Sequence, residues 1–310
     1  MSQQVGYAVN FLGTAFAVPL PDLNEDFRKD LAPVSDDHES IAKYFNYSLK
    51  LCASRRFPYF TASNIDGKLF KKASRAKSWK KDPRIDKGHQ WGEELYKATK
   101  SDFDKGHMTK REDVQWGKTI LQAQKAADQT FFYSNAVPQH ADLNQQIWKS
   151  LEDYILHTET NQKELKVCVF TGPALRPDDP LFVTRVGENE IQIPALFWKV
   201  VYFTTEEGKL KRVGFLMSQR KLLLSHEITR DSEFETGDEL FMQFDDADTY
   251  QVNISLIEEL AGISLPKAED PFHDQRSKKL VLREVEVGDE ELESDSPVAR
   301  LGFIIENIEL

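Results

Sequence analysis

Two histidines of the 310-residue chain stand in the same tetrapeptide, Asp-Lys-Gly-His, which ends once at His89 and once at His107. Imidazole readily exchanges a proton near pH 7, because its ordinary pKa is about 6.5. The glycine before each histidine allows a close approach of the backbone, but the tetrapeptide alone is common in loops. The residues that follow each histidine must therefore decide which copy could do chemistry.

The segment after His107 carries polar groups that suit metal-assisted hydrolysis. Asn135 and Asn144 offer amide oxygens, and Glu152 adds a carboxylate eight residues after Asn144. Hard oxygen donors suit Mg²⁺, which usually keeps several of its waters. On a helix, that spacing places Glu152 about 80° around the axis from Asn144, where it could hold a water of the metal or orient a neighbour. Taken alone, each residue is more often a helix cap or a solvated side chain.

This ordered string resembles the DNA/RNA non-specific endonucleases, the family of Serratia nuclease and mitochondrial endonuclease G. SNAVPQHADLNQQIWKSLEDY, which runs from Ser134 to Tyr154, matches the second half of the family signature with its spacing intact. Other segments, among them GYAVNFLGTAFAVPLP and IPALFWKVV, are similar to a bacterial subgroup. The resemblance covers about residues 6–272 and so predicts one endonuclease domain there, followed by an acidic C-terminal extension over residues 273–310.

The resemblance also implies the catalytic residues. His107, rather than His89, stands at the position of the catalytic histidine, which deprotonates a water for attack on phosphorus. Asn144 stands at the position of the one direct protein ligand of Mg²⁺, for which Mn²⁺ is the expected substitute. Asn135 would fix or polarise the histidine region, and Glu152 would act beside the metal.

Charged residues complete the site that the resemblance implies. Asp104 would orient the loop of the catalytic histidine through backbone contacts. Lys105 and Arg111 would bind substrate, although Lys105 replaces the usual arginine and so loses its bidentate geometry. For the cation at the scissile phosphate, Lys77 aligns best and Arg75 is the close alternative.

Positive charge is concentrated in one segment before this site. Residues 68–87 carry nine basic and two acidic side chains, whereas the whole chain has a net charge of −11. Such a segment suits the phosphate backbone of DNA and RNA, although a solvated lysine-rich loop has the same composition. Because contacts to phosphate carry no sequence information, we expect little sequence selectivity.

Negative charge is concentrated at the other end. Residues 231–310 carry 22 acidic and six basic side chains. Within this region, residues 274–310 could shield the basic segment or dock a regulatory partner or activator, as a latent bacterial defence or toxin effector would need. A solvated tail that aids solubility is the alternative. Family members include dimers, so a homodimer also stays open.

Two departures from the family pattern keep another class of function open. Lys105 stands in place of an arginine, and Leu156 stands where many members have an arginine, four residues after Glu152. A chain with these changes could be a catalytically weak or inactive nucleic-acid-binding module. Metal-independent binding without strand scission would identify it.

Hydrophobic patterns predict a mixed fold. Leu165–Thr171 is predicted to be a strand that ends in a turn at Gly172 and Pro173, and Phe197–Thr204 with Lys211–Met217 a β-hairpin. Helices are predicted over three segments: Val114–Asp128, Asn144–Leu156 and Ser255–Ala261. We therefore expect an α+β protein with a central, mostly antiparallel sheet flanked by helices, and the resemblance implies the ββα-metal (His-Me finger) arrangement.

Composition excludes several classes of protein. Two cysteines cannot form a disulfide framework or a cysteine zinc cluster. The apolar stretch Val5–Leu20 is too short to span a bilayer and lacks the basic start of a secretory signal. We expect no membrane partner and a cytoplasmic location in a bacterium.

Overall fold

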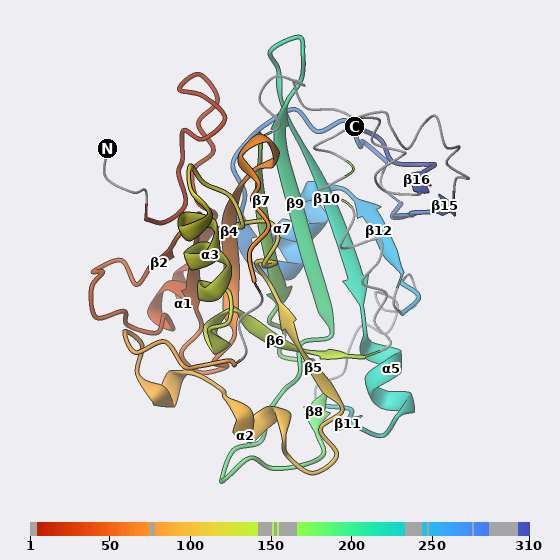
Figure 1. Cartoon of the computed structure of the whole chain (residues 1–310). Coiled ribbons are helices and arrows are strands. Elements are labelled where there is room, and N and C mark those ends of the chain that lie inside the picture. Colours follow the sequence, from red (N-terminus) through yellow and green to blue (C-terminus); the bar gives the residue numbers. More distant parts are fainter. Residues whose placement is uncertain are drawn as a thin grey trace.

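The computed structural model describes residues 5–74, 78–141, 151, 154, 166–232, 244–246, 248–274, 276–284 and 303–310. Over these residues, the largest element is an eight-stranded sheet in the order β14-β12-β10-β9-β7-β4-β3-β2 (Figure 1). Its strands are β2 (Ala42–Tyr44), β3 (Tyr47–Leu51), β4 (Pro58–Asp66), β7 (Lys166–Ala174), β9 (Leu196–Thr204), β10 (Leu210–Ser218), β12 (Thr249–Val252) and β14 (Lys278–Lys279). All neighbouring strands are antiparallel, which confirms the predicted sheet.

The central strands alternate their side chains between two apolar faces. On β7, Val167 and Val169 belong to the core on one face, and Cys168 and Phe170 to the core on the other. A strand that is covered on both faces becomes apolar at nearly every position, because neither set of side chains meets water. The predicted hairpin is the pair β9–β10, which is joined through residues 205–209.

The turn predicted at Gly172 and Pro173 is wrong, because β7 continues through both residues. Gly172 pairs with Trp198 and Pro173 with Phe197 of β9. A Cβ on Gly172 would lie 2.5 Å from the carbonyl oxygen of Tyr59 and 2.9 Å from the Trp198 ring, so glycine allows close packing here. Pro173 lies beyond the last residue pair between β7 and β4, so its missing N–H takes nothing from that ladder.

One sheet face is covered by helix α7 (Ile254–Ala261), as the sequence predicts, together with the N-terminal segment. The side chain of Asn253 accepts a hydrogen bond from the Ser255 N–H at the start of α7. Gly262 ends the helix at a φ of 64°, which favours glycine. Figure 1 shows α7 behind the sheet and the β5–β6 pair on the viewer's side.

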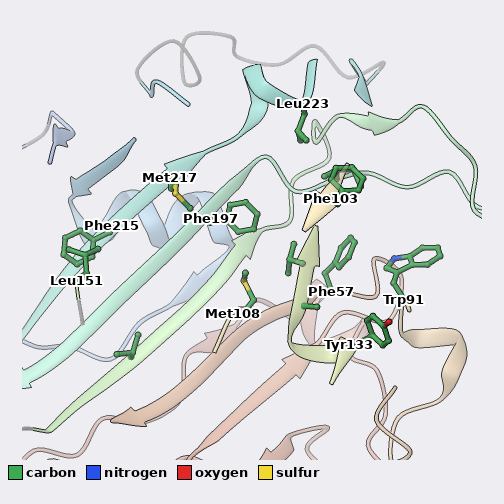
Figure 2. Close-up of a cluster of buried hydrophobic side chains, with 14 of the residues drawn as sticks. Phe57, Trp91, Phe103, Met108, Tyr133, Leu151, Phe197, Phe215, Met217 and Leu223 are labelled. Carbon is green, nitrogen blue, oxygen red and sulfur yellow. The ribbon is translucent and has the colours of Figure 1, made fainter. Parts of the chain in front are cut away.

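The other face carries the second large core and the site described below. Figure 2 shows Leu151 beside Phe215 on the sheet, with Met108 and Tyr133 in the same cluster. Leu151 and Tyr154 are helical, Leu151 is fully buried, and Tyr154 packs against this core. The rest of the helix predicted over Asn144–Leu156 lies outside the described residues.

The helix predicted over Val114–Asp128 starts later than expected, at α3 (Ile120–Gln129). Residues 111–114 form a turn, and Trp116 pairs with Phe70 in an isolated bridge, so the chain before α3 is not helical. Thr119 then starts the helix with a capping box, in which its hydroxyl accepts from the Gln122 N–H. The apolar residues before Thr119 have the spacing expected of a helix, although they do not form one.

Short elements surround this frame. They are β1 (Asp22–Leu23), α1 (Glu25–Lys29), α2 (Glu93–Tyr96), β5 (Phe103–His107), β6 (Ala136–His140), β8 (Leu181–Phe182), α5 (Arg220–Ser225), β11 (Thr229–Arg230) and β13 (Ile263–Ser264). Across the described parts of the chain, no helix is both long and apolar enough to cross a bilayer.

The described parts of the acidic region pack on the sheet. β14 pairs with β12, and β15 (Leu282–Glu284) pairs with β16 (Phe303–Ile305). Leu280 and Ile305 are buried in the same core as Leu151. The Lys211 ammonium donates to the carbonyl oxygen of Leu310 at 3.2 Å. The apolar residues of this region therefore anchor it to the sheet.

Candidate active site

His107 ends a short strand that the sequence does not reveal. β5 and β6 pair antiparallel, with Gly106 opposite Val137 and His107 opposite Ala136. A Cβ on Gly106 would lie 2.2 Å from the side chain of Gln139, so only glycine lets β5 approach this side chain. The expected loop around Asp104 is therefore wrong, because residues 103–107 are strand.

Asn135 fixes the chain directly after His107. Its side-chain oxygen accepts from the Thr109 N–H at 2.8 Å. Its amide group donates to the carbonyl oxygens of Thr109, at 2.9 Å, and Thr130, at 3.0 Å. Asn135 is fully buried, and the Met108 N–H donates to its backbone carbonyl oxygen at 2.9 Å. These four bonds hold the backbone that carries the histidine.

Aromatic rings confine the imidazole of His107. The Trp79 ring lies 4.5 Å from it between centroids at a tilt of 51°. Phe131 meets it edge-on at 5.0 Å and also contacts Trp79. Trp79 is anchored by its neighbour Lys80, whose backbone N–H donates to the Phe131 carbonyl oxygen at 3.1 Å. The rings limit the orientations open to the imidazole without burying it fully.

His107 lines an open pocket of about 560 Å³ that is rich in cations. Four basic side chains line it: Lys105, Lys110, Arg111 and Lys199. Asp104, Glu112 and Gln139 add oxygen atoms. Charge of this kind, in a partly enclosed space, attracts an anionic ligand. The second Asp-Lys-Gly-His histidine, His89, does not line this pocket.

Arg111 and Glu112 form an ion pair at the pocket wall. The guanidinium donates to one carboxylate oxygen from Nη2 at 2.6 Å and from Nε at 3.0 Å. Burial raises the pKa of Glu112, but the hydrogen bond and the charges of Arg111 and Lys110 outweigh it and lower that pKa below its usual value. Glu112 therefore stays ionised at neutral pH and is no proton donor.

Lys199 is a pocket residue that the sequence reasoning missed. It lies on β9, on the same face as the core around Leu151, and its exposed fraction is 2%. A charged group is rarely buried unless it interacts with a partner charge or polar group. The signal was visible, because Lys199 interrupts the apolar run Leu196–Phe203. Phe131 and Gln139 were missed too, since neither type is distinctive at its position.

The predicted site residues fall into two groups. His107, Asp104, Lys105 and Arg111 line the pocket together, whereas Asn135 lies behind it as a positioning residue. The other predicted residues lie outside the described part of the chain: Arg75, Lys77, Asn144 and Glu152. Their described neighbours are close to the site, because Trp79 contacts His107 and Gln139 lines the pocket.

The pocket is compatible with a hydrated divalent cation. Within the described residues, no group of three or more His, Cys, Asp or Glu side chains could hold a metal ion. Mg²⁺ needs only one or two protein oxygens and keeps its remaining waters, for which an open pocket has room. Asp104 and Gln139 supply hard oxygen atoms at its edge.

The chain is similar in sequence to known proteins. The sequence profile described as DNA/RNA non-specific endonuclease matches residues 26–271. The uncharacterized protein y4fB of Sinorhizobium fredii is 33% identical over 228 residues, 71% of this chain and 33% of that protein. Mitochondrial endonuclease G of Bos taurus is 31% identical over 133 residues, 39% of this chain and 42% of that protein. The match thus covers a third of the length of the first relative and less than half of the length of the second.

A solved structure gives the same result for the fold. The crystal structure of the EndoG/EndoGI complex matches 72% of this chain and 84% of its own with a TM-score of 0.50 and 20% identity. The match confirms the predicted nuclease fold with its large antiparallel sheet. Since the family profile spans most of the sequence, the chain belongs to the DNA/RNA non-specific endonuclease family.

Proposed function

We propose that this chain is a divalent-metal-dependent endonuclease that hydrolyses phosphodiester bonds of DNA and RNA. The position of His107 is the observation that carries the proposal. His107 ends β5 and lines a pocket with several basic side chains, in a chain that belongs to the nuclease family. A phosphate bound there would meet positive charge and a proton acceptor together. The hydrolysis needs both, because the attacking water loses a proton while negative charge builds on phosphorus.

His107 is the proposed general base. A neutral imidazole takes a proton from water as the water oxygen forms a bond to phosphorus, in line with the departing 3′ oxygen. The bond between phosphorus and the 3′ oxygen breaks, and that oxygen takes up a proton from a water molecule, so the phosphate stays on the 5′ end and the 3′ end becomes a hydroxyl. Trp79 and Phe131 hold the ring in a narrow range of orientations, which favours proton transfer along one direction.

Asn144 is the proposed ligand of the metal, with Glu152 beside it. A bound Mg²⁺, or Mn²⁺ as its substitute, would neutralise charge on the phosphate and on the departing oxygen. Asn144 follows the last residue of β6 by four positions, and β6 carries Gln139 of the pocket wall. This connection supports its placement near the pocket.

Basic side chains would hold the nucleic-acid backbone. Lys105 and Arg111 line the pocket, and Lys77 or Arg75 precedes Trp79 by two or four residues. These groups recognise phosphate, which is the same at every step of the polymer. We therefore propose cleavage with little sequence selectivity.

Purified protein incubated with supercoiled plasmid or a long RNA tests this function. Nicking and degradation are expected with Mg²⁺ or Mn²⁺ and not with EDTA. The DNA ends should be ligated without prior phosphorylation, because the 5′ phosphate is retained. Intact nucleic acid in every lane, together with a metal-independent mobility shift, would contradict the enzyme and identify a binding module.

We propose in addition that the acidic C-terminal region regulates the site. Leu280 and Ile305 anchor this region in the same core as Met108, which lies next to His107. Its acidic side chains are thereby kept on the molecule whose pocket is basic. Attraction between the two charges would compete with binding of nucleic acid, as a latent effector requires.

A further inference from the structure

A row of alternating cations and one aromatic side chain leads away from the pocket. Exposure alternates from a short 3-10 helix (Gly67–Leu69) into the segment that follows it: Lys68, Phe70, Lys72 and Ser74 are exposed, whereas the residues between them are partly buried. Every second side chain of residues 68–74 therefore faces solvent. Phe70 is 49% exposed, which is unusual for a residue of this size and apolarity.

The segment is fixed rather than loosely attached. Lys71 exchanges two hydrogen bonds with Gln115: its N–H donates to the Gln115 carbonyl oxygen at 3.1 Å, and its own carbonyl oxygen accepts from the Gln115 side chain at 2.9 Å. Phe70 pairs with Trp116, and Ser74 donates to the side chain of Gln124 at 2.8 Å. Phe70 is therefore presented to solvent by a well-bonded backbone.

The row is continuous with the candidate active site. Arg111 of the pocket wall donates to the carbonyl oxygen of Ala73 at 3.3 Å. From Ala73 to Phe70 the three residues of chain span at most about 10 Å. That length corresponds to roughly three stacked nucleotides at 3.4 Å each. A strand whose phosphate lies in the pocket would reach Phe70 without leaving the surface.

The neighbouring charges decide what Phe70 contacts. In the described part of the chain, no ion pair engages Lys68 or Lys72. An apolar protein partner would have to cover both ammonium groups at a cost in desolvation. A single-stranded nucleic acid places phosphates on the cations and a base on the ring.

We propose that Phe70 is a stacking platform for an unpaired base of the substrate, flanked by Lys68 and Lys72 as phosphate contacts. The proposal rests on the nuclease function proposed above and adds a preference for single-stranded or locally unpaired DNA and RNA. Bases inside a duplex are stacked on each other and leave no face for Phe70. The platform should therefore strengthen binding to single strands alone.

The experiment measures affinity without cleavage. Full-length His107→Ala protein in EDTA is titrated with a labelled 12-nucleotide single strand and with a 12-base-pair duplex. Phe70→Leu keeps an apolar side chain but removes the aromatic face, and Phe70→Tyr retains it. We expect Phe70→Leu to weaken single-strand binding about tenfold, with Phe70→Tyr near the parent and duplex binding unchanged in both.

The length of the oligonucleotide provides a second test. Because Phe70 lies roughly three nucleotides from the pocket, a dinucleotide should bind equally to the Phe70→Leu and parent proteins. Equal single-strand affinity of these two proteins for the 12-mer would overturn the platform while leaving the nuclease proposal intact. A Phe70→Leu change that alters only the sedimentation coefficient would assign this surface to self-association instead. Absence of any single-strand binding by the parent would overturn the platform, whereas the cleavage assay with metal decides the nuclease proposal.

Discussion

Asn135 contributes to the site without lining the pocket. Its side chain satisfies one N–H and two carbonyl groups of the backbone around Thr109 and Thr130, all in a fully buried setting. A buried backbone group that loses its partner costs about 1–3 kcal/mol. Asn135 therefore helps to determine where His107 stands, although it is not among the residues that line the pocket.

Replacing Asn135 separates this role from a catalytic one. Asn135→Ala should lower the free energy of unfolding by at least about 2 kcal/mol and reduce kcat while leaving KM little changed. Asn135→Asp should be worse, because a carboxylate cannot donate to the Thr109 and Thr130 carbonyl oxygens. Denaturant unfolding and steady-state kinetics check this. Full stability with the same loss of kcat would mean that Asn135 acts on the reacting groups.

At the scale of elements, buried polar contacts join the pieces that surround the imidazole. The Asp82 carboxylate accepts from the Tyr44 hydroxyl of β2 at 2.6 Å and from Arg84 at 2.8 Å. The same hydroxyl lies 2.9 Å from the Ser134 hydroxyl. Asp82 thus links the segment of Trp79 to β2 and to the turn that contains Asn135.

Burial alone would raise the pKa of Asp82, but the hydrogen bonds from Arg84 and Tyr44 and the Arg84 charge outweigh it and lower that pKa. The native state therefore binds the Asp82 proton more weakly than the unfolded chain, whose carboxyl has a pKa of about 3.9. The stabilisation is complete above that value and is lost as pH falls towards the folded pKa.

Asp82→Asn tests this linkage. At pH 7 the variant should lose about 3 kcal/mol, because Arg84 loses its buried partner and keeps only the exposed carboxylate of Asp36. The difference from wild type should shrink below pH 4, as the wild-type carboxylate is protonated. Urea unfolding from pH 3 to 7 measures it. A difference that is the same at every pH would contradict the role of the ionised carboxylate.

The helices and strands differ in how well the sequence alone predicts them. The β9–β10 hairpin and α7 follow from apolar periodicity, since each buries a complete face. β5 and β6 could not be predicted, because they pair across about 30 residues of sequence and neither has a distinct apolar alternation of its own. The basic row of residues 68–74 was visible as composition, but its exposed alternation depends on pairing with residues 115–117.

At the scale of the whole molecule, a basic site and an acidic C-terminal region are both attached to the same sheet. Lys211 contacts the C-terminal Leu310, and Gln251 of β12 exchanges hydrogen bonds with the backbone of Glu309. A truncation after Phe272 would remove the buried Leu280 and Ile305 together with the acidic side chains. An effect on DNA binding could then come from lower stability as well as from lost charge. Neutralising charge without shortening the chain is therefore the sharper test of regulation.

Substitution of the acidic run at residues 290–295, with Gln for Glu290, Glu291 and Glu293 and Asn for Asp295, provides that test. If the run competes with substrate, DNA affinity and cleavage should rise a few-fold at low salt and equal wild type at high salt, where charges are screened. The same protein should keep its thermal midpoint. Unchanged affinity at low salt would show that this run does not shield the site.

His107, and not its twin His89, is the proposed general base. Single-turnover cleavage of a defined DNA with Mg²⁺ should fall by about 10²–10⁴-fold in His107→Ala and stay near wild type in His89→Ala. Added imidazole should restore part of the His107→Ala rate, since the space between Trp79 and Phe131 would admit it. Wild-type cleavage by His107→Ala, or an equal loss in both variants, would contradict the account.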